Sequence, residues 1–178
     1  MNILLGVTGS IAAYKAADIT SRLTKHGHNV DEILTESGSR IITPLTLQTL
    51  SRNKVYMDMF EEITPSEVKH ISLAKKADVV LIAPATANII GKIAYGIADD
   101  FLSTVVMAAA KDTPVFIAPA MNTNMYENPI VQDNIEKLRS YGYRFIEPKE
   151  SLLACGDLGK GALADVDTIV EIIEGSKE

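Results

Sequence analysis

The sequence predicts an α/β fold, with a parallel β-sheet between two layers of helices. Short, continuous apolar runs at residues 3–7 and 79–83 are typical of strands that are buried on both faces. Segments with helical spacing alternate with such runs, which indicates parallel βαβ units. No linker, low-complexity segment or long repeat interrupts the 178 residues, so we expect one domain over residues 1–178.

Composition and charge exclude several classes of protein. Apolar types make up 47% and charged types 22%, which is ordinary for a globular domain, and the net charge of −6 disfavours nucleic acid as a partner. A single cysteine, Cys155, excludes a disulfide scaffold and a cysteine-based zinc site. The N-terminus lacks a basic leader, and the apolar run at 101–110 has about half the ~20 residues that span a bilayer. We therefore expect a cytoplasmic protein with a free thiol.

The first half of the chain begins with a strand at residues 3–7. The helix that follows has one apolar face, formed by Ala12, Ala16, Ile19 and Leu23. Ser10 suits its N-cap, and Gly27 suits the position after its C-cap. The next expected elements are a strand with an acidic middle at 30–34, a loop or helix start at 35–38, a helix at 44–50, a short strand or loop at 54–59, and a short helix at 68–74.

In the second half, we expect strands at 79–83, 115–118 and 143–146, and helices at 87–94, 100–110, 128–140 and 165–173. The helix at 100–110 is apolar almost all round, so it is either deeply buried or placed at a subunit contact. The segment 147–163 is rich in glycine, which predicts a loop.

Two similar turns mark the expected functional edge of the sheet. Ala83-Pro84-Ala85 and Ala118-Pro119-Ala120 each follow a strand, and each is followed by an asparagine, Asn88 or Asn122. Ligands of open parallel sheets bind outside the carboxyl ends of the strands. Both turns should therefore lie beside a binding site.

The turn Thr8-Gly9-Ser10-Ile11 is a candidate phosphate site, because it opens a helix and Gly9 permits close approach. Without a three-glycine fingerprint or a Walker lysine, a mononucleotide fits better than a dinucleotide. The hydroxyls of residues 35–37 lie within reach of the same phosphate, and the small side chains of residues 84–88 suit a flat ring. The alternative is that all three segments are ordinary helix caps.

The histidines and the single cysteine are the remaining candidates for catalytic or metal-binding residues. His26 and His28 flank Gly27, which favours a solvated turn over a metal site. His70 is placed to reach a cleft, although a packed or surface histidine is the commoner case. Cys155 lies among glycines, where a thiol can donate a proton when the segment closes over a substrate; the alternative is an incidental small apolar residue.

Residues 119–126, with the sequence PAMNTNMY, resemble the Pro-x-Met-Asn-x-x-Met-Trp motif of the homo-oligomeric flavin-containing cysteine decarboxylases. The segment GVTGSIAAYK at 6–15 looks like the opening of that family, and PATAN at 84–88 is similar to its Pro-Ala-Ser/Thr-Ala-Asn turn. His70 falls where the family has its active-site histidine. The resemblance covers residues 3 to about 163.

The segment Leu153-Ala154-Cys155-Gly156 looks like the substrate flap of those members that act on 4′-phospho-N-pantothenoylcysteine. Two residues depart from the family pattern. Tyr126 replaces a tryptophan but keeps an aromatic ring, and Ala162 stands where many bacterial members have an arginine, which puts an ionic contact of the flap in question. The chain ends at Glu178, so we expect a stand-alone decarboxylase without a fused ligase domain.

The resemblance implies a Rossmann-like, flavodoxin-like three-layer fold and bound FMN. It further implies conversion of 4′-phospho-N-pantothenoylcysteine to 4′-phosphopantetheine, a step of coenzyme A biosynthesis. Oxidation of the substrate thiol to a thioaldehyde provides the electron sink for loss of CO2, and the ene-thiolate is then protonated and reduced. The expected assembly is a trimer or a dodecamer.

The same resemblance assigns roles to residues. His70 is the acid/base or positioning group in thiol oxidation, Asn122 hydrogen-bonds the substrate carboxylate, and Cys155 donates the proton to the ene-thiolate. Met125 and Ala154 also contact the substrate, and Met121 lines the pocket unless it is core filling. The expected FMN contacts are Gly9, Ser10, Ile11, Ser37, Thr86 and Asn88.

Three alternatives remain on this reading. A peptidyl-cysteine decarboxylase would share His70 and the Pro-x-Met-Asn motif but not the Ala-Cys-Gly flap. A flavin-binding regulatory protein without turnover would typically lack one catalytic position, whereas His70, Asn122 and Cys155 are all present. A flavin prenyltransferase on the same fold would need neither the motif nor the flap.

Overall fold

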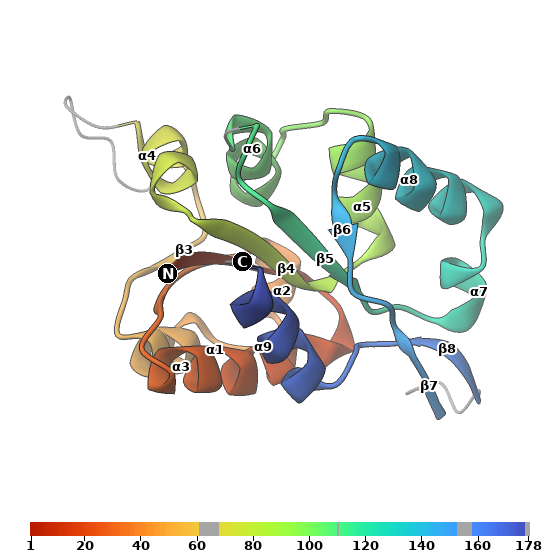
Figure 1. The fold of residues 1–178 in the computed structure, drawn as a ribbon, viewed down its shortest axis with the longest axis horizontal. Coiled ribbons are helices and arrows are strands. Elements are labelled where there is room, and N and C mark those ends of the chain that lie inside the picture. Colours follow the sequence, from red (N-terminus) through yellow and green to blue (C-terminus); the bar gives the residue numbers. More distant parts are fainter. Residues whose placement is uncertain (61–67, 110, 153–157, 177–178) are drawn as a thin grey trace.

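In the computed structural model, which describes residues 1–60, 68–109, 111–152 and 158–176, the apolar runs form a six-stranded parallel sheet (Figure 1). In sheet order the strands are β3 (Val55–Tyr56), β2 (Asn29–Leu34), β1 (Asn2–Val7), β4 (Val79–Ala85), β5 (Val115–Pro119) and β6 (Arg144–Phe145). Every residue of β4 and β5 is buried, which explains their continuous apolar sequences.

Two layers of helices cover the sheet (Figure 1). One layer contains α1 (Ala16–Lys25), α3 (Pro44–Ser51) and α9 (Val166–Gly175). The other contains α4 (Lys69–Lys76), α5 (Ala87–Ala94), α6 (Phe101–Ala108) and α8 (Pro129–Ser140). Each layer shares its own apolar core with the sheet, so the predicted three-layer α/β fold is confirmed.

Three short helices follow strand ends: the 3-10 helix η1 (Ile11–Lys15), α2 (Glu36–Ser39) and α7 (Thr123–Tyr126). The helix expected after Gly9 therefore begins as η1 and continues as α1. The ambiguous segment at 54–59 contains only the two residues of β3 as strand. The apolar helix expected at 100–110 is α6, which buries Phe101, Leu102 and Val105 but exposes Met107.

The prediction of a loop at 147–163 is wrong for much of that segment. Strands β7 (Lys149–Leu152) and β8 (Leu158–Ala162) pair as an antiparallel hairpin outside the main sheet. Glycines weaken local strand propensity, so the sequence suggests a loop. In the hairpin, Gly161 lies against Met121 and Gly159 against Thr123 at the start of α7, so these glycines serve contacts that are distant in the sequence.

The order of the strands reverses between β1 and β4, which is the place where open α/β sheets bind ligands. Hydrogen bonds hold the turns after these strands together. The Thr8 hydroxyl donates to the Pro84 carbonyl at 2.7 Å and accepts from the Thr86 N–H at 3.1 Å. The Ala120 N–H donates to the Ala85 carbonyl at 3.0 Å, which adds the turn after β5. The two proline segments lie at the carboxyl edge of the sheet, as predicted, but they form the ends of β4 and β5 rather than turns after them, and Ala85 pairs with Pro119.

Within the described part of the chain, no helix combines the length and the apolar character needed to cross a bilayer. The same residues contain no group of three or more histidine, cysteine or acidic side chains arranged to hold a metal ion.

Candidate active site

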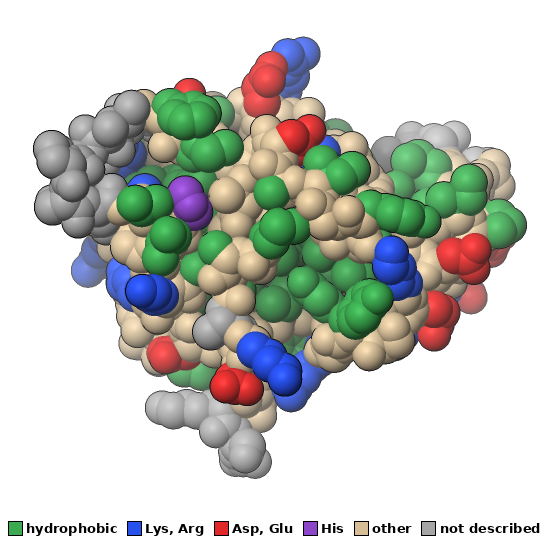
Figure 2. All heavy atoms as spheres, turned by 90° about the horizontal axis from the view of Figure 1, so that it is seen from above, with side chains coloured by type: hydrophobic (Ala, Val, Ile, Leu, Met, Phe, Trp, Pro, Cys, Tyr) green, Lys and Arg blue, Asp and Glu red, His purple; other side chains and the backbone are tan. Residues whose placement is uncertain are grey.

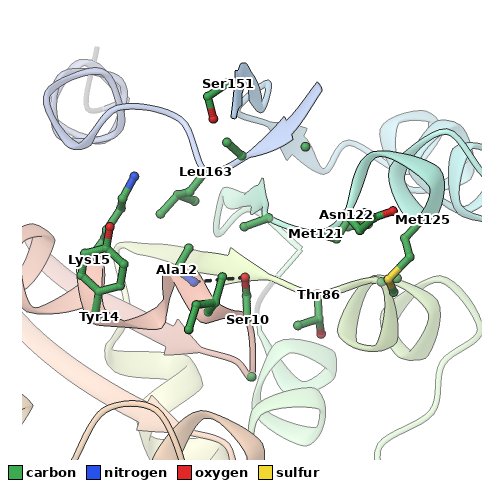
Figure 3. A pocket seen from close by; sticks show the side chains of 16 residues that line it. Ser10, Ala12, Tyr14, Lys15, Thr86, Met121, Asn122, Met125, Ser151 and Leu163 are labelled. Carbon is green, nitrogen blue, oxygen red and sulfur yellow. Dashed lines mark hydrogen bonds between the residues drawn. The ribbon is translucent and has the colours of Figure 1, made fainter. Parts of the chain in front are cut away.

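A cavity of about 480 Å³ opens at the carboxyl ends of the strands (Figure 3). We call it the hairpin cavity, because β7 and β8 form one of its walls. The other walls come from η1, from the turn between β4 and α5, and from the segment 120–125. Its lining residues are Gly9, Ser10, Ile11, Ala12, Tyr14, Lys15, Thr86, Ala87, Ala120, Met121, Asn122, Met125, Ser151, Gly161, Ala162 and Leu163.

A second cavity, also of about 480 Å³, adjoins the first and shares Gly9, Thr86, Ala87 and Met125 with it. We call it the hydroxyl cavity, because Thr8, Thr35, Ser37 and Thr86 all line it. Its other lining residues are Glu36, Asn88, Ile89, Lys92, Asp99 and Asp100. Together the two cavities give a continuous site with a hydroxyl-rich end and an apolar end.

The hydroxyl cavity depends on a close approach at Gly9. A Cβ atom at Gly9 would lie 2.5 Å from the Cβ of Ser37, so only glycine lets the turn after β1 and helix α2 pack this closely. That packing brings the Ser37 side chain to the cavity. The first turn of α5 also faces the cavity, where its backbone N–H groups and dipole favour an anion. The hydroxyl and N–H donors at this end suit a phosphate, and Lys92 offsets part of the negative charge of Glu36, Asp99 and Asp100 there.

Helix capping, the alternative interpretation of these turns, is confirmed at two of them. Ser10 caps η1 by accepting from the Ala12 N–H at 3.3 Å, and Thr86 caps α5 by accepting from the Ile89 N–H at 3.3 Å. Both residues also line a cavity. The structure places all six expected FMN contacts along the two cavities: Gly9, Ser10, Ile11, Ser37, Thr86 and Asn88.

A charged group at the hydroxyl cavity was missed by sequence reasoning. The Lys92 ammonium lies 2.6 Å from the Asp99 carboxylate and 2.7 Å from that of Asp100. Burial raises the pKa of Asp100, but hydrogen bonds from Lys92 and from Ser103 outweigh it, so the pKa lies below its usual value. Asp100 also caps α6, accepting from the Ser103 N–H at 2.8 Å. The sequence pattern could have predicted that Asp100 and Ser103 cap a helix, but not that Asp100 contacts Lys92.

Asn122 is held at the start of α7. Its side-chain oxygen accepts the Asn124 N–H at 2.8 Å, so the amide NH2 is the donor end of the side chain. Figure 3 shows Asn122 and Met125 on the same side of the hairpin cavity. Met121 lines the cavity and packs partly on the core, while Met125 lies between the two cavities. Asn122 therefore presents a neutral amide to an apolar pocket.

The hairpin packs directly on the Asn122 segment. The Met121 N–H donates to the Gly161 carbonyl at 2.9 Å. Gly161 has a φ of +148°, and a Cβ there would lie 2.3 Å from the Met121 oxygen; a Cβ at Gly159 would lie 2.5 Å from the Thr123 hydroxyl. Glycine is thus required for this contact. Cys155 and Ala154 lie outside the described residues, between the two strands of the hairpin.

Tyr126, the expected substitute for tryptophan, is buried, and its hydroxyl donates to Glu147 at 3.3 Å. Burial raises its pKa, and the negative charge of Glu147 acts in the same direction. Ala162 lines the hairpin cavity and brings no charge to it.

The histidines lie away from both cavities. His70 is the second residue of α4 and is half-buried, and it is not among the residues that line either cavity of its own chain. His26 and His28 both contact the Glu174 carboxylate, at 2.7 and 3.0 Å. These contacts lower the pKa of Glu174. His26 is exposed as expected, but His28 is partly buried, so the turn is not fully solvated.

Comparison with known families and sequences gives a consistent result. The family model described as Flavoprotein matches residues 1–177. A probable phosphopantothenoylcysteine decarboxylase of Streptococcus mutans is 54% identical over 97% of this chain and 96% of its own length. The coenzyme A biosynthesis bifunctional protein CoaBC of Bacillus subtilis is 53% identical over 97% of this chain. The chain spans only 42% of that bifunctional protein.

Solved structures agree with the sequence relatives. A PPC decarboxylase mutant complexed with pantothenoylaminoethenethiol superposes with a TM-score of 0.89 and is 31% identical, covering 99% of this chain and 97% of its own. The FMN-dependent cysteine decarboxylase SpaF gives a TM-score of 0.86 at 31% identity, covering 100% of this chain and 98% of its own. The likeness includes the hairpin end of the chain as well as the sheet.

Proposed function

This chain belongs to the Flavoprotein family, and on that premise we propose that it is an FMN-dependent phosphopantothenoylcysteine decarboxylase. It would convert 4′-phospho-N-pantothenoylcysteine to 4′-phosphopantetheine with release of CO2. One structural observation supports the proposal independently of the similarity to relatives. The hydroxyl cavity, which suits a phosphate, adjoins the hairpin cavity, which is lined by Asn122. The names of the decarboxylases of 54% and 31% identity support the same substrate class.

The residues around the two cavities fit FMN. Ser37, Thr86 and Asn88, together with the first turn of α5, would hold the phosphate and the ribityl chain in the hydroxyl cavity. Ser10 and Ile11 would line the ring from the η1 side, and Gly9 permits close approach at the junction. When bound, FMN supplies a two-electron acceptor that takes electrons from the substrate thiol and later returns them.

The chain itself would bind and orient the substrate. The Asn122 amide would donate to the cysteine carboxylate, and as a neutral group it would not hold back the leaving CO2 as a cation would. Met125 and Ala154 would contact the same end of the substrate. Cys155 would deliver the proton to the ene-thiolate left by CO2 loss, because the hairpin that carries it packs against the Asn122 segment.

His70 is the residue that the fold of one chain does not bring to the cavities. We therefore assign it to the site of a neighbouring copy, in a homo-oligomer that is a trimer or a dodecamer. Exposed apolar side chains support such an assembly: Ile11 and Tyr14 are 64% and 60% exposed beside the hairpin cavity, and Val68 is 54% exposed beside His70. Figure 2 shows further apolar side chains over the face that carries α4, α5, α6 and α8.

The assembly and its location complete the proposal. Residues 1–178 would form one decarboxylase domain. A proton-donating thiol at Cys155 must stay reduced, which the cytoplasm provides. The enzyme is therefore assigned to the cytoplasm.

The test is a comparison of two substrates on the flavin-loaded protein. Release of CO2 is measured with 4′-phospho-N-pantothenoylcysteine and with a peptide that ends in cysteine. We expect turnover of the phosphorylated compound only. Asn122→Ala should lower kcat/KM by about 10- to 100-fold through loss of a hydrogen bond to a charged group, while Asn124→Ala, an exposed neighbour, should act like the native protein.

Two results would contradict the proposal. Faster turnover of the peptide would identify a peptidyl-cysteine decarboxylase instead. Binding of the phosphorylated compound without any CO2 from either substrate would identify a flavin-binding protein that does not catalyse the reaction.

A further inference from the structure

We propose that Glu147 is a positioning residue for the decarboxylation: its carboxylate joins the hairpin to helix α7 and so holds the Asn122 amide in place. The inference rests on the proposed decarboxylase function. It concerns a residue that is not among those lining either cavity, and that acts only through the residues it contacts.

Glu147 lies between β6 and β7, where its carboxylate meets side chains from three other elements. Oε2 accepts a hydrogen bond from the Tyr126 hydroxyl of α7 at 3.3 Å and another from the Lys160 ammonium of β8 at 3.0 Å. Oε1 accepts a hydrogen bond from the Arg139 guanidinium of α8. One carboxylate therefore joins α7, α8 and the hairpin.

These contacts continue through the backbone to Asn122. From α7, the Tyr126 N–H donates to the Asn122 carbonyl at 2.9 Å. From the hairpin, Lys160 precedes Gly161, whose carbonyl accepts the Met121 N–H at 2.9 Å. The result is a closed ring of contacts, formed by Glu147, Tyr126, Asn122, Met121, Gly161 and Lys160. Asn122 is thus held from both sides.

The ring depends on several charges that act together. The side chains of Glu147 and Lys160 are 49% and 40% exposed, and an isolated ion pair at such exposure contributes little. Here one carboxylate has three partners, and the Lys160 ammonium also lies 5.5 Å from the centre of the Tyr126 ring, which is buried. A network of this kind can hold one geometry where a single pair cannot.

Both charges of the central pair persist at neutral pH. Burial raises the pKa of Glu147, but hydrogen bonds from Lys160 and Arg139 outweigh it, so the pKa lies below its usual value. The hydrogen bond to Glu147 raises the pKa of Lys160. The ion pair is therefore present under the conditions of the reaction.

The position of the Asn122 amide should matter for the substrate but not for the product. Asn122 would bind the carboxylate that leaves as CO2, and a displacement of about 1 Å at an orienting group can lower a rate by about 100-fold. The product, 4′-phosphopantetheine, lacks this carboxylate. A residue that acts through Asn122 should therefore affect the substrate and leave product binding unchanged.

The experiment uses the flavin-loaded protein. It measures kcat/KM for 4′-phospho-N-pantothenoylcysteine and the inhibition constant of 4′-phosphopantetheine. Glu147→Gln removes the charge but leaves an amide oxygen for the Tyr126 hydroxyl. It should lower kcat/KM by about 10-fold, while the inhibition constant and the FMN absorbance stay within about twofold of the native values.

Two further variants test whether the residues act as one network. Lys160→Met should lower kcat/KM by a similar factor, and Lys160→Arg should retain most of the native value because it keeps the ion pair. The double variant of Glu147→Gln with Lys160→Met should be no less active than either single variant, since both changes break the same ring.

Glu136→Gln is the matched control. The Glu136 carboxylate also pairs with Arg139, at 3.3 Å, but it lies on the same helix, α8, and is 72% exposed. It does not belong to the ring of contacts around Asn122. Glu136→Gln should therefore have the native kcat/KM and the native inhibition constant.

Three outcomes would overturn the assignment. Native kcat/KM in Glu147→Gln would show that the network does not position Asn122. An equal fall in kcat/KM and in affinity for 4′-phosphopantetheine, or loss of bound FMN, would give Glu147 a structural role only. Losses that multiply in the double variant would mean that Glu147 and Lys160 act separately. Failure of the native protein to decarboxylate would refute the proposed function itself, which is a different result from any of these.

Discussion

Glu32 is the least expected side chain of the interior. The sequence shows an acidic middle in the strand at 30–34, and the structure separates its two carboxylates onto opposite faces of β2. Asp31 lies 2.6 Å from the Lys76 ammonium, whereas Glu32 is fully buried on the α1 side. There the Thr20 hydroxyl donates to Glu32 Oε1 at 2.6 Å, and Oε2 has no hydrogen-bond partner among the described residues. Burial raises the pKa of Glu32 to about 7.

The stability of the fold should therefore depend on Glu32 and pH. Because the pKa is about 7 when folded and near 4.5 when unfolded, the folded state binds the extra proton between these values. The free energy of unfolding should fall by about 3 kcal/mol as the pH rises from 4.5 through 7. Urea unfolding at a fixed protein concentration, at pH 5 and pH 8, measures the difference.

The control for this prediction is a second glutamate. Glu32→Gln should remove most of the pH dependence, while Glu171→Gln, on the exposed face of α9, should retain it. An unchanged slope in Glu32→Gln would show that the buried carboxyl is ionised in the native protein.

The hairpin of β7 and β8 shows how an element outside the sheet contributes to the site. It joins the Asn122 segment through the hydrogen bond from Met121 to Gly161 and through contacts that only glycine permits. The same two strands flank the segment that carries Cys155. The hairpin therefore packs β8 against the segment that holds the proposed carboxylate-binding group.

A methyl group at Gly161 should push the hairpin away from the Asn122 segment. Gly161→Ala places a Cβ against the Met121 carbonyl and strains the backbone, so kcat should fall roughly 10- to 100-fold from misplacement of the reacting groups. FMN absorbance should be retained, since the hydroxyl cavity does not include Gly161. Gly175→Ala, where a Cβ meets no atom within 4 Å, is the control. Native kcat in Gly161→Ala would show that this contact is not needed for catalysis.

The hairpin is an element that the sequence does not predict, in contrast to the strands of the main sheet. Strands such as β4 were predictable because burial on both faces requires a continuous apolar run. The positions of Gly9 and Thr86 beside the cavities were predictable because both stand at turns between strands and helices. The hairpin was not, because its two glycines reflect contacts with Met121 and Thr123 rather than a local preference for a turn. The pairing of Lys92 with Asp99 was not predictable either, because it depends on how the loop before α6 folds back onto α5.

A single copy of the chain does not bring together all the residues of the proposed site. One chain provides Asn122, the hairpin and the hydroxyl cavity, but it places His70 away from both cavities. Exposed apolar groups such as Ile11 and Val68 lie on these two separate regions. A head-to-tail contact between copies would bring the two regions together, and such a contact gives a closed ring when the rotation between copies closes.

Mixing two impaired variants tests this arrangement. Alone, His70→Asn should be nearly inactive and Asn122→Ala should be about 10- to 100-fold less active than the native protein, both with FMN still bound. Co-expressed in equal amounts, they should regain roughly a quarter of native activity, because one site in four receives a native Asn122 from one copy and a native His70 from the next. Mixing the two variants after separate purification is the control. No recovery on co-expression would mean that both residues act within one chain.

The most direct test of the whole account is titration of flavin-free protein with FMN and with riboflavin, followed by absorbance. The hydroxyl cavity should make FMN bind at one equivalent per chain and at least about 10-fold more tightly than riboflavin, which lacks the phosphate. A folded protein that remains colourless with FMN, or one that binds both flavins equally, would contradict it.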